Sequence, residues 1–137
     1  MTLPLLALAL LTGPPAQAAG DRDNWTVARH VAAEFGVSPV LMIGIRYHEN
    51  PKRHNDYKAL GVKRGHGWWP GGMSGQYHKA AQIVARYAKR HGWDPRKPTR
   101  QQVSDLGAFY AEGSRHWGRE VWSFYRRMHT KRAEAAR

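Results

Sequence analysis

Acidic residues are scarce in this chain, and one of them, Glu49, stands where a carboxyl group could act as an acid. The chain carries 10 acidic residues against 22 Lys and Arg, and Glu49 closely follows the apolar run at 40–45. If that run is a buried helix, its C-terminal dipole and apolar surroundings both disfavour a negative charge. A carboxyl that keeps its proton near neutral pH can protonate a leaving glycosidic oxygen. The alternative is an ordinary exposed Glu that offsets the local excess of basic residues.

Other catalytic arrangements do not fit the residue spacing. His48 and His54 flank Glu49, but the zinc-protease motif needs two His four residues apart, whereas these are separated by six, with Pro51 between them. The segment Gly-Met-Ser-Gly at 72–75 resembles part of a serine nucleophile elbow, yet no strand is expected before it. The chain has no Cys, which excludes thiolate ligands and cysteine nucleophiles. We therefore predict neither a metal site nor a cofactor.

Several residues in and around an aperiodic, Gly-rich segment could bind sugar rings. Trp68 and Trp69 offer flat apolar faces with a hydrogen-bonding edge, which suits stacking on sugars, but they could equally pack the segment onto the core. Asp56 is the nearest candidate in sequence for a second carboxylate, with a solvated loop Asp as the alternative. Trp117 falls on an apolar helical stripe and is interpreted as a core residue without chemistry.

The elements that must position these residues are four or five helices. The sequence shows no convincing strand and therefore predicts an all-α, mainly helical fold. Two starts are well marked, by Ser38-Pro39 and by the capping box Thr99-x-x-Gln102. Residues 51–75 lack any period, and a connection of that length is usually functional or disordered. The tail at 130–137 is expected to fray. The expected helices lie at about 24–35, from Pro39 to before Asn50, at about 75–91, from Thr99 to before Gly113, and at about 116–128.

The N-terminus and the overall charge predict an exported protein. An apolar run and the small-x-small pattern Ala16-Gln17-Ala18 predict a signal peptide at 1–19, followed by a single domain at 20–137 without a membrane span. The formal charge of +12 lies wholly on the second part, and the pI near 10.6 indicates a polyanionic neighbour. We expect a secreted, periplasmic or wall-associated monomer whose anionic partner is the cell envelope rather than nucleic acid.

Four segments, in order, resemble soluble lytic transglycosylase domains of the lysozyme-like superfamily. FGVSPVLMIGIRYHE at 35–49 is similar to the start that leads through an apolar helix to that family's catalytic Glu. ALGV at 59–62 resembles the Gly-containing segment that follows the Glu. FYAEG at 109–113 resembles the family's Tyr-Asn-Ala-Gly segment, and residues 121–127 resemble its terminal helix. The order and spacing cover roughly residues 24–128.

The resemblance implies a lysozyme-like domain that cleaves the bond between N-acetylmuramic acid and N-acetylglucosamine in peptidoglycan. Glu49 would be the acid/base and Tyr110 would line the site, whereas Asn50 and the run at 62–64 depart from the family's Ser and its Leu-Met-Gln-like run. A single carboxylate favours an anhydro product over hydrolysis. The alternative is a non-catalytic basic protein on the same fold that binds the envelope or nucleic acid. The residues expected to hold sugar rings are Tyr57, Trp68, Trp69 and Tyr110.

Overall fold

Helix α3 (Pro39–Glu49) lies at the centre of the fold, as its apolar composition predicts. In the computed structural model, which describes residues 21–51, 58–111, 114 and 116–135, every residue from 40 to 46 is buried. The helix begins as expected, because the Ser38 hydroxyl accepts a hydrogen bond from the Leu41 amide at 3.2 Å and Pro39 occupies the first turn. The buried central helix predicted from the sequence is therefore confirmed.

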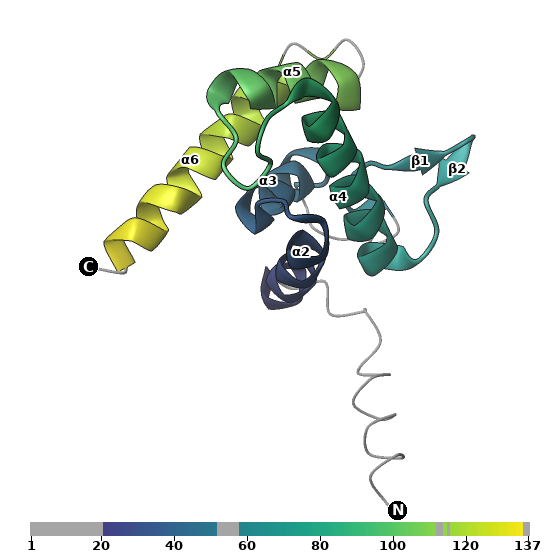
Figure 1. Cartoon of the computed structure of the whole chain (residues 1–137). Coiled ribbons are helices and arrows are strands. Elements are labelled where there is room, and N and C mark those ends of the chain that lie inside the picture. Colours follow the sequence, from purple (N-terminus) through teal and green to yellow (C-terminus); the bar gives the residue numbers. More distant parts are fainter. Residues whose placement is uncertain (1–20, 52–57, 112–113, 115, 136–137) are drawn as a thin grey trace, which may run out of the picture.

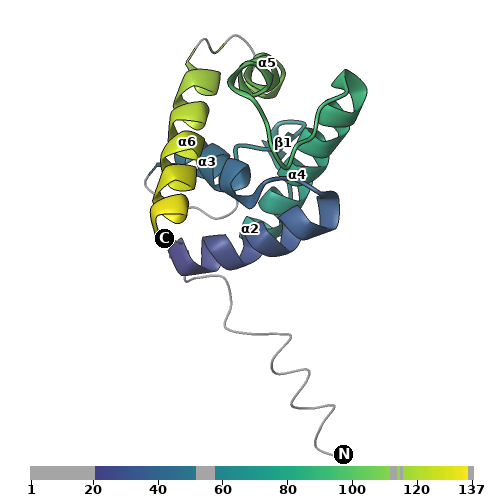
Figure 2. The same ribbon diagram turned by 60° about the vertical axis from the view of Figure 1, so that its left-hand side comes forward.

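Three longer helices surround α3, and a further helix packs on one of them. Helices α2 (Asp21–Phe35), α4 (Gly72–His91) and α6 (Trp117–Ala135) all pack against α3, and α4 and α6 lie on opposite sides of it (Figures 1 and 2). Helix α5 (Arg100–Tyr110) packs across α6, as Figure 2 shows, and begins with the predicted capping box. These five helices account for most of the described residues, and the strands for few, so the all-α prediction is confirmed.

The segment between α3 and α4 contains a short hairpin that the sequence analysis did not predict. Strands β1 (Lys63–Arg64) and β2 (Gly67–Trp68) pair antiparallel, with Lys63 opposite Trp68 and Arg64 opposite Gly67. The hairpin projects from the helical body next to α4 (Figure 1). Strands of two exposed residues carry no alternation of apolar and polar side chains, so periodicity could not reveal them.

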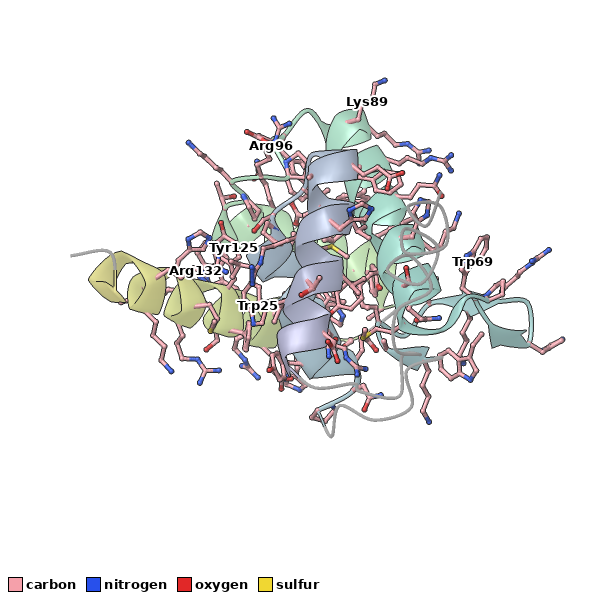
Figure 3. All side chains as sticks on the ribbon, turned by 90° about the horizontal axis from the view of Figure 1, so that it is seen from below. Trp25, Trp69, Lys89, Arg96, Tyr125 and Arg132 are labelled. Atoms are coloured by element: carbon pink, nitrogen blue, oxygen red, sulfur yellow. The ribbon has the colours of Figure 1, made fainter. Side chains whose placement is uncertain are left out.

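Helix boundaries differ from the expected ones at three places. Helices α2 and α4 each begin three residues earlier than expected, at Asp21 and Gly72. Helix α6 continues to Ala135, so the expectation that the tail frays from residue 130 is wrong. One contact that holds this extension joins Arg132 to Trp25 on α2, because the guanidinium lies 4.4 Å from the centre of the indole ring. Figure 3 labels both residues.

A buried polar cluster links three helices to the segment that follows α3. Arg46 is fully buried, and its guanidinium donates to the side chain of Asn24 at 3.0 Å and to the Ala59 carbonyl at 3.3 Å. The Tyr77 hydroxyl donates to the same Asn24 oxygen at 2.8 Å. Buried charge is tolerated only when it is hydrogen-bonded, so this cluster fixes α2, α4 and residue 59 relative to the end of α3.

Two further sequence expectations concern the signal peptide and membrane spans. The predicted signal peptide at 1–19 lies outside the described residues. Among the helices that the structure describes, none is both long and apolar enough to cross a membrane.

Candidate active site

Glu49 is the last residue of α3, and its side chain is half-buried. The helix ends here because Pro51 disfavours helical backbone before it, and the Asn50 amide closes the last turn on the Arg46 carbonyl at 2.9 Å. The carboxyl group lies between the indole of Trp117 at the start of α6 and the backbone of Gly61. Three segments far apart in sequence therefore meet at this carboxyl.

Trp117 donates a hydrogen bond from its indole Nε1 to Glu49 Oε1 at 2.9 Å. The Trp117 side chain is fully buried, which confirms the prediction that it belongs to the core. The further interpretation that it has no chemical role does not account for this hydrogen bond. A buried indole N–H needs an acceptor, and here the acceptor is the candidate acid itself.

The position of Trp117 depends on a close approach between α5 and α6. A Cβ atom at Gly107 would lie 2.7 Å from Trp117 Cε3, so the absence of a side chain lets the indole rest on the backbone of α5. The Tyr110 ring, one turn further along α5, lies 5.3 Å from the Trp117 ring between centroids. Helix α5 thus holds the indole under the carboxyl of Glu49.

Gly61 covers the other side of the carboxyl. Its backbone adopts φ +71°, and a Cβ atom built there would lie 2.6 Å from Glu49 Oε2. Both the left-handed conformation and the close approach require glycine. The segment that the resemblance aligns with the Gly-containing family motif is therefore packed directly against the candidate acid.

Gln76 of α4 holds the segment around Gly61 in place. Its fully buried side-chain amide accepts from the backbone amides of Leu60 at 3.2 Å and Val62 at 3.0 Å. The same amide donates to the Val62 carbonyl at 2.9 Å and to the Trp69 carbonyl at 3.3 Å. One side chain therefore satisfies backbone polar groups on both sides of Gly61. It also connects this segment to the end of the hairpin.

A groove of about 560 Å³ opens above the Glu49 carboxyl, a volume typical of small-ligand sites. Its walls come from the segment after α3, from α4 and from the end of α5. Within the part of the chain that the structure describes, Glu49 is the only acidic residue in the lining. The lining residues are Glu49, Gly61, Val62, Lys63, Ile83, Phe109, Tyr110 and Ala111.

Burial raises the pKa of the Glu49 carboxyl above its ordinary value. The Trp117 hydrogen bond and the charge of His48 act in the opposite direction, because both stabilise the carboxylate, but burial is the larger effect. The carboxyl therefore keeps its proton to a higher pH than an ordinary Glu side chain does. A group with both states accessible can deliver a proton and later take one up.

Tyr110 lies beside Glu49 in the groove, where the resemblance places it. Its hydroxyl donates to the Leu60 carbonyl at 2.7 Å. Burial, and then the nearby charge of Glu49, raise the pKa of the Tyr110 phenol well above its ordinary value. Tyr110 therefore stays a neutral hydrogen-bonding group. Its hydrogen bond fixes the Leu60 carbonyl, and with it the backbone that leads into Gly61.

His48 points away from the groove and pairs with a different carboxyl group. Its Nδ1 atom lies 2.6 Å from Glu120 Oε2 on α6, and its ring makes an edge contact with Trp117 at 6.1 Å. Among the described residues, no group of three or more His, Asp and Glu is arranged to hold a metal ion.

The two candidate tryptophans of the hairpin lie outside the groove lining. Trp68 is 36% exposed, and the ammonium groups of Lys58 and Lys63 lie 6.0 Å and 5.3 Å from the centre of its ring. Trp69 packs partly against the core, with the Lys79 ammonium 4.4 Å from its ring, and Figure 3 shows it on the hairpin side of the molecule. Trp69 therefore packs against the core, which is the second of the two interpretations of this residue.

The remaining sequence candidates, Asp56 and Tyr57, lie outside the described residues, as do His54 and residues 112–113 of the FYAEG segment. Sequence reasoning missed the contacts of Trp117 and Gln76, which only the folded arrangement brings to the site. A weak signal existed for Trp117, because a buried indole requires a hydrogen-bond acceptor and acids are scarce in this chain.

No protein-family model matches this chain, and neither a curated protein nor a solved structure is similar enough to it to count as a match. The geometry around Glu49 and the resemblance of the sequence segments are therefore the two grounds for a functional proposal.

Proposed function

We propose that this protein cleaves the glycosidic bond between N-acetylmuramic acid and N-acetylglucosamine in peptidoglycan, with Glu49 as the general acid and base. The observation that carries the proposal is the desolvated carboxyl of Glu49 in a groove, hydrogen-bonded to Trp117 and backed by Gly61. A carboxyl with this environment is what protonation of a glycosidic oxygen requires. The ordered resemblance to lytic transglycosylase domains supplies the substrate class.

In the proposed reaction, Glu49 first donates its proton to the glycosidic oxygen as the bond to C1 of the muramyl residue breaks. The carboxylate so formed then accepts the proton of the C6 hydroxyl of the same sugar. The C6 oxygen bonds to C1, which gives a 1,6-anhydro product and returns Glu49 to its protonated form. No water is consumed, so one carboxyl group suffices.

The described lining of the groove supports this route over hydrolysis. Hydrolysing glycosidases usually use a second carboxylate, and Glu49 is the only acid among the lining residues that the structure describes. Glu120, on α6, pairs with His48 and does not line the groove. The apolar wall formed by Ile83 and Phe109 is suited to the face of a sugar ring.

The alternative function, a non-catalytic basic envelope or nucleic-acid binding protein, is less well supported. Such a protein has no need of a half-buried carboxyl in a groove, and an exposed Glu49 on the outer surface would have favoured it. The N-terminal pattern at 1–19 supports export, and we propose that the protein acts in the periplasm or at the wall.

The test is digestion of purified peptidoglycan with mass analysis of the released fragments. We compare wild type with Glu49→Gln, which keeps a hydrogen-bond acceptor for Trp117, and with the control Glu34→Gln. Glu34 is an exposed carboxyl on α2 that lies 3.4 Å from His78. Anhydro fragments from wild type and from the control, reduced by at least about a thousandfold in Glu49→Gln, are expected.

Other product patterns separate the alternatives. Reducing-end fragments that depend on Glu49 would overturn the anhydro route and indicate a muramidase. Release that is equal in wild type and Glu49→Gln, or no release from any wall preparation, would contradict the catalytic role of Glu49 and favour the binding protein.

A further inference from the structure

A second groove, of about 540 Å³, lies along α6 and is distinct from the Glu49 groove. It is lined mainly by α6, with one residue from the start of α5. Among the residues that the structure describes, the lining holds no acid and five cations: Arg100, Arg119, Arg126, Arg127 and Lys131. Trp122 forms its principal apolar surface. We call this cavity the basic groove.

The cations of the basic groove have no carboxylate partner within the part of the chain that the structure describes. All five side chains are exposed. The polar contacts of Arg119 and Arg127 are to the ring of His116 at 2.6 Å and to the Ser123 carbonyl at 3.4 Å, neither of which is an acid. Like charges gathered without counter-charges destabilise a folded chain. An anionic ligand would remove that cost.

The residue types favour phosphate as the anionic group. Four of the five cations are Arg, whose planar guanidinium matches phosphate oxygens in a bidentate geometry better than an ammonium does. The cations also line a concavity, which accommodates a chain passing through it more readily than a flat lipid surface. The ligand class is therefore a linear polymer with repeated phosphate groups.

The aromatic content of the groove distinguishes between such polymers. Grooves that bind single-stranded nucleic acid without sequence preference present several aromatic faces on which bases stack. Trp122 is the only aromatic ring that lines this groove in the described chain, and it stacks on Tyr125 with centroids 5.3 Å apart. One of its faces is therefore occupied. A phosphate polymer without bases fits this lining better.

We propose that the basic groove binds a phosphodiester-linked polyol polymer of the cell envelope through paired Arg–phosphate contacts. This binding goes beyond the proposed cleavage reaction, because it requires α6 cations and does not require Glu49. It gives the protein a means of retention at the wall, at a surface separate from the groove that acts on glycan.

The experiment measures binding of the full chain to fluorescently labelled synthetic poly(glycerol phosphate) by fluorescence anisotropy. The test variant is Arg126→Gln/Arg127→Gln, and the matched control is Arg86→Gln/Arg90→Gln. The control removes the same charge from exposed positions on α4, on the opposite side of α3 (Figures 1 and 2). We expect about tenfold weaker binding for the test variant, from the loss of two charge-assisted contacts, and less than about twofold for the control.

Two results would overturn the proposal. Equal weakening in both double variants would show that net charge, and not this groove, governs binding. Tighter groove-dependent binding to vesicles of phosphatidylglycerol and phosphatidylcholine, or to oligothymidylate, would assign the groove to lipid or to nucleic acid instead. Glu49→Gln is measured in parallel and should bind as wild type, so failure of the cleavage proposal and failure of this one give different results.

Discussion

The two grooves of this molecule have similar volumes, about 560 and 540 Å³, but opposite chemistry. The Glu49 groove contains one partly desolvated carboxyl that is held by a fully buried indole and by a backbone with positive φ. The basic groove gathers five exposed cations on long, flexible side chains. The first depends on exact placement of few atoms, whereas the second depends on charge density. Substitutions, salt and pH should therefore affect the two grooves differently.

Apart from replacement of Glu49 itself, the largest expected effect comes from adding one carbon atom beside it. Gly61→Ala forces a Cβ atom to within 2.6 Å of Glu49 Oε2 and strains a backbone at φ +71°. Displacement of the acid by about 1 Å should reduce the rate of peptidoglycan cleavage about a hundredfold. The rate of fragment release measures this effect.

The control for that substitution is Gly65→Ala in the hairpin. Gly65 has a similar φ of +62°, but nothing lies within 4 Å of the added Cβ. The control therefore shares the conformational strain and lacks the clash, and it should retain most of the activity. Equal losses in the two variants would mean that backbone strain, and not contact with Glu49, limits the site.

A smaller effect is expected from removing only the hydrogen bond to Glu49. Trp117→Phe keeps an aromatic ring in the core but removes the indole N–H that lowers the pKa of Glu49. The pKa should rise further, so the fall in activity with increasing pH should occur at higher pH than in wild type. The free energy of unfolding should decrease by about 1–3 kcal/mol, because a half-buried acceptor loses its donor and a gap opens.

The matched control is Trp122→Phe in the basic groove, which removes an indole N–H from the same helix without touching Glu49. Its pH–activity profile should coincide with that of wild type. An unchanged profile in Trp117→Phe would show that the Trp117 hydrogen bond does not tune the acid.

A smaller difference between the two grooves is expected in their response to salt concentration. Raising NaCl from about 0.05 M to about 0.5 M shortens the screening length from roughly 14 Å to 4 Å and should weaken poly(glycerol phosphate) binding severalfold. The hydrogen bond between Trp117 and Glu49 is partly buried, so cleavage of short peptidoglycan fragments should change less than binding does. Parallel salt titrations of binding and of cleavage measure this contrast. Equal sensitivity of both would contradict it.

The smallest expected effect is on the pH dependence of stability. Because the pKa of Glu49 is raised on folding, the native state holds its proton more tightly, and stability decreases as pH rises from the ordinary value of 4.5 through the raised one. Glu49→Gln has no ionisable group at this position, so its stability does not decrease for this reason. The difference in melting temperature between Glu49→Gln and wild type should therefore increase over that range and then level off. A constant difference would contradict the raised pKa.

Local signals in the sequence predicted the helices and the place of Glu49 at the end of one of them, because both depend on neighbouring residues. The caps at Ser38 and Thr99 marked two helix starts correctly, and the apolar run before Glu49 indicated a buried helix. Glu49 could be singled out because its position at the end of that helix follows from the same run. The extension of α6 was missed, since its contact between Arg132 and Trp25 joins distant parts of the chain.

The surroundings of Glu49 could not be predicted, because they come from residues with no local sign of a role. Trp117 is 68 residues from Glu49, and its apolar stripe indicates burial without indicating what its N–H contacts. Gln76 stands on a helix stripe where a polar residue looks like a surface position, yet it is fully buried. Only long-range packing makes these residues part of the site.

The bracing by Gln76 bears on how such a domain could change its specificity. The amide fixes residues 60 and 62 from α4, and Arg46 holds the Ala59 carbonyl from α3, so the backbone around Gly61 is anchored by side chains of two different helices. We expect the setting of Glu49 to depend strongly on these two side chains, although neither of them lines the groove. If the proposed function holds, directed evolution toward other glycans should keep Arg46 and Gln76 and vary positions outside this frame.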